Sequence, residues 1–169
     1  MNENPRIEIM DTTLRDGEQT CGVSFVPHEK LMIARLLLEE LRVDRIEVAS
    51  ARVSEGEFNA VRMICDWAAR KNLLSRVEVL GFVDGKTSVD WIYNTGCRVI
   101  NLLTKGSEKH CTFQLKKTLQ EHLADIRKTV AYAIDKGMDV NVYLEDWSNG
   151  IKDSPDYVFG LVDGLKDTG

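Results

Sequence analysis

The chain has 169 residues, 43% of them hydrophobic and 29% charged, which suits one domain with an apolar core and is short for two. Its formal net charge of -5 argues against nucleic acid or an anionic membrane as a partner, because both attract basic surfaces. The sequence shows no apolar run of about 18 residues and no secretory signal pattern, so we expect a cytoplasmic protein without a membrane span. Its four cysteines lack a C-x-x-C spacing and are expected to be reduced thiols.

Strand and helix patterns alternate along the whole chain. The expected strands cover residues 6–10, 44–49, 77–80, 99–103 and 140–144. Expected helices begin at Pro27, at a capping box from Ser54 to Glu57, at Thr87, after a polar loop that ends near Thr112, and at Ser154. Gly96 and Gly137 are expected to end helices.

Five consecutive strand–helix units predict a parallel sheet, because each crossover helix returns the chain to start a strand in the same direction. Two architectures remain open on this pattern. A doubly wound domain that binds a nucleotide fits the length, whereas a complete eight-stranded barrel needs about 250 residues. However, the loop after the first strand lacks a glycine-rich phosphate cradle and presents acids and an arginine instead.

That loop, residues 11–19, reads Asp-Thr-Thr-Leu-Arg-Asp-Gly-Glu-Gln and concentrates charge at the end of the first strand. Carboxylates beside an arginine can hold a divalent cation while the guanidinium stabilises a developing anion. The alternative is a solvated loop with a surface ion pair, which is how most charge clusters are used. Spacing alone leaves both interpretations open.

The literal string resembles the N-terminal signature of the metal-dependent enzymes that carry out acyl-CoA Claisen condensations. This TIM-barrel family includes the 2-isopropylmalate, homocitrate and citramalate synthases, with 3-hydroxy-3-methylglutaryl-CoA lyase as a relative. The resemblance continues through residues 22–24, Pro27 and residues 29–31 and is strongest to the 2-isopropylmalate synthases, although Thr20 and Cys21 replace a common Ser-Pro. It implies a (β/α)8 TIM barrel, of which residues 1–169 would be about the first five βα units, the other strands and any regulatory domain being absent.

The resemblance also implies roles for residues of the first loop. Arg15 would be the catalytic arginine, Asp16 the metal-ligating carboxylate, and Gln19 a contact to the substrate. Asp11 is interpreted as mainly structural, with its side chain capping the turn.

Three further candidates lie later in the chain. Glu47 interrupts the apolar run of the second strand, and we expect either substrate binding or an interior ion pair, with Arg15 or with a basic residue of a neighbouring strand. His110 is similar to a substrate-binding position of the family, with a surface histidine as the alternative. Glu145 ends the fifth strand at the position of a family active-site glutamate, which implies a catalytic role as base partner or orienting group. His28 and His122 are expected at the surface.

The activity that the resemblance implies is condensation of acetyl-CoA with a 2-oxo acid, most closely 2-oxoisovalerate, using Mn²⁺, Mg²⁺ or Zn²⁺, in a homo-oligomer. The family completes its metal site with a His-x-His pair, which does not occur in this sequence, so we expect the chain by itself to be inactive. Two other hypotheses stay open: a non-catalytic nucleotide-binding module, and a fragment that acts by pairing its sheet edges.

Overall fold

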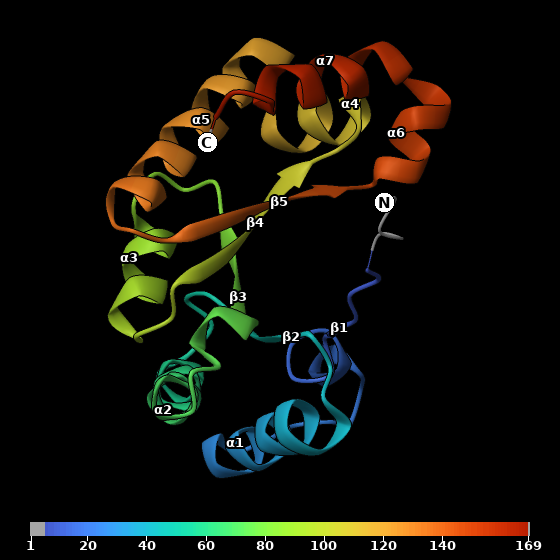
Figure 1. Cartoon of the computed structure of the whole chain (residues 1–169). Coiled ribbons are helices and arrows are strands. Elements are labelled where there is room, and N and C mark those ends of the chain that lie inside the picture. The colour runs from blue at the N-terminus through green and yellow to red at the C-terminus, as the bar shows by residue number, and fades with distance from the viewer. Residues whose placement is uncertain (1–5, 169) are drawn as a thin grey trace, which may run out of the picture.

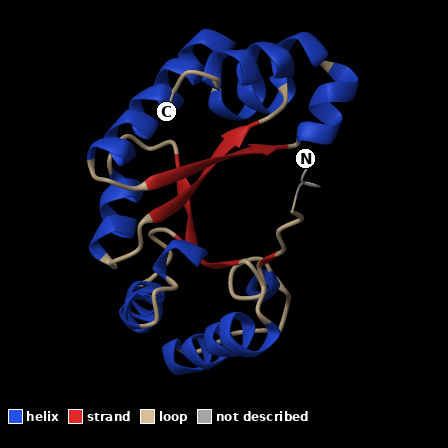
Figure 2. Cartoon of the chain, viewed as in Figure 1, coloured by secondary structure: helices blue, strands red, loops and turns tan. Residues whose placement is uncertain are grey.

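The structure is a computed structural model that describes residues 6–168, so positions 1–5 and 169 of the expected barrel portion lie outside it. Its strands form one parallel sheet of five in the order β1-β2-β3-β4-β5. The strands are β1 (Met10–Asp11), β2 (Arg45–Ser50), β3 (Val77–Phe82), β4 (Val99–Lys105) and β5 (Asp139–Glu145). The sheet curves, and the helices lie outside the curve (Figures 1 and 2).

The helices connect successive strands as the sequence predicts, with several additional short segments. They are η1 (Gly17–Gln19), α1 (Pro27–Arg35), η2 (Leu36–Leu41), α2 (Glu55–Arg70), η3 (Leu74–Arg76), α3 (Thr87–Asn94), α4 (Glu108–His110), η4 (Cys111–Leu115), α5 (Leu119–Asp135), α6 (Trp147–Asp153) and α7 (Pro155–Leu165). Within the described part of the chain, no helix is long and apolar enough to cross a membrane.

The strand order decides between the two expected architectures. In a doubly wound sheet the order reverses at a switch point, whereas here each strand pairs with the next one in sequence. The curvature is that of a closing barrel, because the hydroxyl of Tyr143 on β5 donates to the sulfur of Met10 on β1 at 3.2 Å across the interior. The chain is therefore a half-barrel of TIM type, and the doubly wound alternative is wrong.

The first expected strand is shorter than predicted. Residues 6–9 are not strand, and the ladder of β1 consists of Met10 beside Arg45 and Asp11 beside Ile46. The preceding segment is held instead by Asp44, whose carboxylate accepts the amide of Ile9 at 2.9 Å. The loop expected from Thr104 to Thr112 also differs, since β4 continues to Lys105 and α4 and η4 follow it.

Helix ends follow the expected signals, with exceptions at two caps. Gly96 and Gly137 have φ of 94° and 73°, the left-handed conformation that a glycine stop supplies. Ser54 accepts the amide of Glu57 at 3.1 Å, but the Glu57 carboxylate binds Lys30, so the reciprocal half of the expected box is not formed. The Ser154 hydroxyl does not cap its own helix α7, because it donates to the Gly150 carbonyl of α6 and accepts the amide of Glu108 at the start of α4, both at 3.3 Å.

The apolar core lies between the sheet and the surrounding helices. On β2, Ile46 and Val48 face this layer and are fully buried, and Ile64 of α2 and Ile92 of α3 pack in the same cluster. The residues that alternate with these point into the barrel, and the buried ones include the polar Glu47, Glu78 and Asn101 as well as the apolar Ala49, Leu80 and Val99. The half-barrel thus has an apolar outer face and an interior that combines polar and apolar side chains.

Candidate functional site

The loop after β1 has a tight backbone fold. The amides of Arg15, Asp16 and Gly17 all donate to the carbonyl of Thr12, at 3.1, 2.8 and 3.1 Å. Asp11 accepts both the amide and the hydroxyl of Thr13, at 2.9 and 3.1 Å, which is the structural role expected for it. This geometry turns the chain sharply at the end of β1 and directs Arg15 toward β2.

Arg15 is held by carboxylates on both sides. Its Nε donates to Glu47 at 2.5 Å, and its Nη1 donates to Asp16 at 2.8 Å. Glu47 is fully buried, and its second oxygen accepts the amide nitrogen of Asn101 on β4 at 2.7 Å. The interior ion pair expected as one of two roles for Glu47 is therefore present, and it orients the guanidinium.

The polar chain continues across the barrel interior. Asn141 on β5 donates to Asn101 at 2.9 Å and to Glu78 at 3.3 Å, and Arg45 donates to Glu78 at 3.2 Å. Burial raises the pKa of the Glu78 carboxyl, an effect that Asn101 and Arg45 offset only in part. A hydrogen-bonded network of this length fixes the relative positions of β2, β3, β4 and β5.

Asp16 offers one carboxylate to a metal ion. Its side chain is 62% exposed, and its Oδ1 is the atom that accepts from Arg15. Among residues 6–168, no three side chains of the His, Cys, Asp and Glu types are grouped closely enough to hold a metal. The described residues do not by themselves fit a divalent ion, and Asp16 could supply only part of such a site.

A cavity of about 260 Å³ adjoins Arg15 on the side of α2. Gln19 is exposed at its edge, which brings this predicted substrate contact next to the predicted catalytic arginine. The remaining lining side chains come from the loop, the end of β2 and the start of α2: Leu14, Glu18, Ala49, Ser50, Val53, Ser54 and Glu57. Four predicted residues, Arg15, Asp16, Gln19 and Glu47, therefore lie together at the β1–β2 end of the half-barrel.

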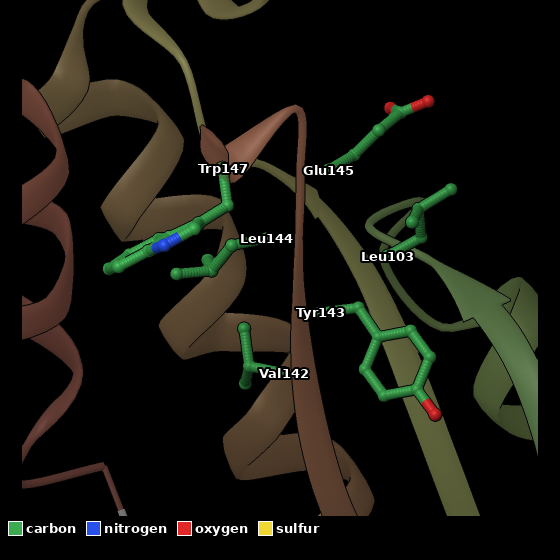
Figure 3. Close-up of a pocket in the computed structure, with 6 residues that line it drawn as sticks. All are labelled: Leu103, Val142, Tyr143, Leu144, Glu145 and Trp147. Carbon is green, nitrogen blue, oxygen red and sulfur yellow. The ribbon is translucent and has the colours of Figure 1, made fainter. Parts of the chain in front are cut away.

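Glu145 lies at the other end, on the edge strand β5. It forms an ion pair with Lys105, which ends the neighbouring strand β4. A larger hollow of about 590 Å³ surrounds this edge, with Leu103, Tyr143 and Glu145 on one side of β5 and Val142, Leu144 and Trp147 on the other (Figure 3). Burial, reinforced by the carboxylates of Glu47 and Glu78, raises the pKa of Tyr143, so its hydroxyl stays protonated.

His110 contacts the residue that follows β5. Its Nε2 lies 3.5 Å from Asp146, which also accepts the Ser107 hydroxyl at 2.8 Å and the Asn149 amide at 2.5 Å. These hydrogen bonds, that of Ser107 first, lower the pKa of Asp146. The contacts tie the loop after β4 to the start of α6, and Asp146 itself adopts the left-handed region with φ of 66°.

Sequence reasoning missed three residues of this region and misplaced a fourth. Asn101, Lys105 and Lys30 all contact predicted site residues or the loop that carries them. A signal existed for Asn101, an amide inside the apolar run Val-Ile-Asn-Leu-Leu. His122, expected at the surface, is only 1% exposed because its Nε2 accepts the amide of Lys105 at 3.1 Å, and burial lowers its pKa.

The fold and site together define a TIM-barrel half with polar residues gathered at the carboxyl ends of its strands, where enzymes of this fold carry out their chemistry. Residues 6–169 match the protein family described as HMGL-like. The chain belongs to this family.

Curated relatives carry several synthase names. The chain is 42% identical over 142 residues to a 2-isopropylmalate synthase of Saccharolobus solfataricus, covering 83% of this chain and 35% of that protein. It is 37% identical to a putative (R)-citramalate synthase of Methanopyrus kandleri, over 96% of this chain and 30% of the relative. A homocitrate synthase of the same organism is 42% identical over 82% of this chain and 33% of its own length. The chain thus spans about a third of these proteins.

Solved structures agree on the fold. The HMG-CoA lyase of Bacillus subtilis superposes with a TM-score of 0.67 at 18% identity, covering all of this chain and 57% of that one. The hydroxymethylglutaryl-CoA lyase of Pseudomonas aeruginosa gives a TM-score of 0.65 at 16% identity, again over the whole of this chain and 57% of the other.

Proposed function

We propose that this chain is the part of a metal-dependent acyltransferase that binds a 2-oxo acid for condensation with acetyl-CoA. One observation carries the proposal: Arg15, in the loop after β1, is oriented by the fully buried Glu47 in a chain of the HMGL-like family. A guanidinium held in this way presents its remaining donors without first reorganising, which is the arrangement that stabilises a carboxylate or a developing oxyanion.

The residues at the β1–β2 end of the half-barrel and those at the ends of β4 and β5 have different roles in the proposed reaction. Arg15 donates to the oxygen atoms of the 2-oxo acid, and Gln19 contacts the same substrate from the edge of the neighbouring cavity. Asp16 would supply one ligand for Mn²⁺, Mg²⁺ or Zn²⁺, and the other ligands would have to come from outside the described residues. Glu145, paired with Lys105, acts as base partner or orienting group, and His110 belongs to the substrate-binding loop after β4.

We favour 2-oxoisovalerate as the 2-oxo acid, and hence 2-isopropylmalate as the product, a step of leucine biosynthesis. The support is the name of the Saccharolobus solfataricus relative and the resemblance of residues 22–24, Pro27 and residues 29–31 to the 2-isopropylmalate synthases. Citramalate and homocitrate synthase activities are the near alternatives, because a difference of one methylene in a hydrophobic pocket changes selectivity by only about 1–3 kcal/mol.

The test is release of coenzyme A thiol from acetyl-CoA in the presence of each of the three metals and a panel of 2-oxo acids. It is run on this chain and on the whole protein that carries it. We expect thiol release by the whole protein, fastest with 2-oxoisovalerate, and none by the chain alone. Preference for another 2-oxo acid would change the assigned substrate. No thiol release with any acid or metal would refute the condensing activity.

A second candidate is an interaction module, and the free edge of β5 favours it. Within residues 6–168, β5 pairs with β4 only, so its other edge offers unpaired backbone groups to a second copy of the chain or to another strand. Self-association through this edge also fits a cytoplasmic homo-oligomer. The candidate predicts concentration-dependent association that survives Arg15→Ala, measured by sedimentation velocity, whereas a monomer at all concentrations would exclude it.

A further inference from the structure

Lys30, in the first turns of α1, is a lysine that the proposed chemistry does not use. Its side chain is fully buried, although the neighbouring Glu29 is exposed. A buried ammonium is costly unless its three donors are paired, so its partners show what the residue does.

Five oxygen atoms surround the Nζ of Lys30. Both oxygens of Glu57 accept at 2.7 and 2.8 Å, and the Glu18 carboxylate lies at 2.5 Å. Two backbone carbonyls complete the set, that of Leu14 at 3.1 Å and that of Val48 at 3.3 Å. One ammonium thus joins the loop after β1, the strand β2 and the first turn of α2.

These contacts bracket the pair formed by Arg15 and Glu47. Leu14 immediately precedes Arg15, and Val48 immediately follows Glu47, so Lys30 holds the backbone beside each partner. Glu18 fixes the far end of the loop as well, because its other oxygen accepts the amide of Phe25 at 2.9 Å.

The charges around Lys30 show that its ammonium is needed to keep the loop after β1 against β2. Glu18 and Glu57 both approach one ammonium, and without it two partly buried carboxylates would face each other. Like charges in a site of reduced dielectric repel, and the flexible partner of the two is the loop that carries Glu18 rather than the helix that carries Glu57. Loss of the ammonium would therefore remove the contacts to Leu14 and Glu18 and add this repulsion, and the lost contacts alone are enough to release the loop from β2.

We propose that Lys30 is a positioning residue, which sets the loop after β1 so that Arg15 meets Glu47. Its bearing on catalysis rests on the proposed function, whereas the positioning itself is a property of this chain. Substrate is contacted by Arg15 and Gln19, and Lys30 acts only through the backbone and the carboxylates of its neighbours.

The experiment follows the Nε–H resonance of Arg15 by NMR in the whole chain labelled with ¹⁵N-arginine. In the wild type we expect this proton to be protected from exchange, because it is donated to Glu47. In Lys30→Met we expect exchange at least about tenfold faster, the loss expected when one charged hydrogen bond is broken. The Nε–H of Arg76, which donates to the Asp44 carbonyl at 2.6 Å, is the internal reference and should not change. Lys117→Met, which removes a lysine paired with Asp125, is the matched control.

A second variant separates positioning from general stability. Lys30→Met combined with Glu57→Gln removes the repulsion between the two carboxylates and should recover much of the unfolding midpoint, yet the Leu14 and Glu18 contacts remain lost. We expect Arg15 to stay unprotected in this variant. Recovery of Arg15 protection together with the midpoint would overturn the proposal, because Lys30 would then act through stability alone.

A milder variant keeps the proposal testable if Lys30→Met does not fold. Glu18→Gln leaves Lys30 paired with Glu57 and weakens only the contact to the loop, so Arg15 should lose part of its protection, and an unchanged Arg15 would overturn the inference. Since no substrate is present, the result is independent of thiol release. Failure of the condensation assay with Lys30-dependent protection of Arg15 would refute the function and keep the positioning role.

Discussion

The ion pair between Glu47 and Arg15 leads to a specific prediction about the free energy of unfolding. Glu47 is fully buried, and the Arg15 side chain is 18% exposed, so solvent screens the pair little. Glu47→Ala leaves the Arg15 guanidinium and the Asn101 amide without their shared acceptor. Breaking a buried pair by removing one partner costs about 3–5 kcal/mol of unfolding free energy, and we expect a value in this range.

The coupling between the two residues is separated from these losses by a double-mutant cycle. In Arg15→Ala, Glu47 keeps Asn101 as a donor, so we expect a smaller loss of about 2–3 kcal/mol. The double variant removes both charges and should be less destabilised than the sum of the two single variants, by about 1.5–3 kcal/mol.

Urea unfolding followed by far-ultraviolet circular dichroism gives the free energies, provided that the slope with denaturant stays constant among the four proteins. Lys166→Ala, in which a lysine that is 66% exposed loses its partner Asp163, is the control and should change the free energy of unfolding by less than about 1 kcal/mol. Additive effects at Glu47 and Arg15, within about 0.5 kcal/mol, would refute the pair as the interaction that orients the arginine.

Three further predictions concern stability. Burial raises the pKa of Glu78 above its ordinary 4.5, so ionisation weakens the fold, and Glu78→Gln should gain unfolding free energy relative to wild type as pH rises from 4.5 to 7 in urea titrations. Burial lowers the pKa of His122 below 6.5, so the wild type, unlike His122→Gln, should lose stability as pH falls below 6.5; parallel slopes would contradict this. A Cβ on Gly150 would lie 2.1 Å from the Gly106 carbonyl oxygen, so Gly150→Ala should lower the melting temperature by several degrees, whereas Gly56→Ala should not.

Local sequence patterns predicted the order of the elements well, because they depend on short-range physics. Pro27 and Gly137 mark a helix start and a helix stop through their own backbone preferences, and both appear where expected. The choice between a barrel and a doubly wound sheet depended on which strands become neighbours. Length favoured the wrong answer, whereas the family resemblance that begins in the charged loop at residues 11–19 pointed to the right one.

The candidate site was predictable where its residues are adjacent in sequence. Arg15, Asp16 and Gln19 share one loop, and their charges alone drew attention to it. The partners that give the loop its geometry come from distant positions: Asn101 reaches Glu47 across 54 residues.

Buried polar residues were the hardest to recognise. An isolated lysine or histidine in a helix is usually at the surface. The helical pattern does not show whether a buried carbonyl or amide is placed to form a hydrogen bond with it. His122 was misplaced for this reason, since one ring nitrogen satisfied by the Lys105 amide is enough to bury a neutral imidazole. Prediction of such residues needs the tertiary contacts themselves.

The most direct test of the central claim compares Arg15→Lys with Arg35→Lys in the whole protein that carries this chain. Arg35 is the matched control, because it lies half-exposed on α1 beside Glu39, outside the cavity. We predict that Arg15→Lys lowers kcat for thiol release about 100- to 1000-fold, since a lysine cannot keep the fork of donors that Glu47 orients, while Arg35→Lys leaves kcat unchanged. A kcat within about threefold of wild type in Arg15→Lys would contradict the assignment of Arg15 as the catalytic arginine.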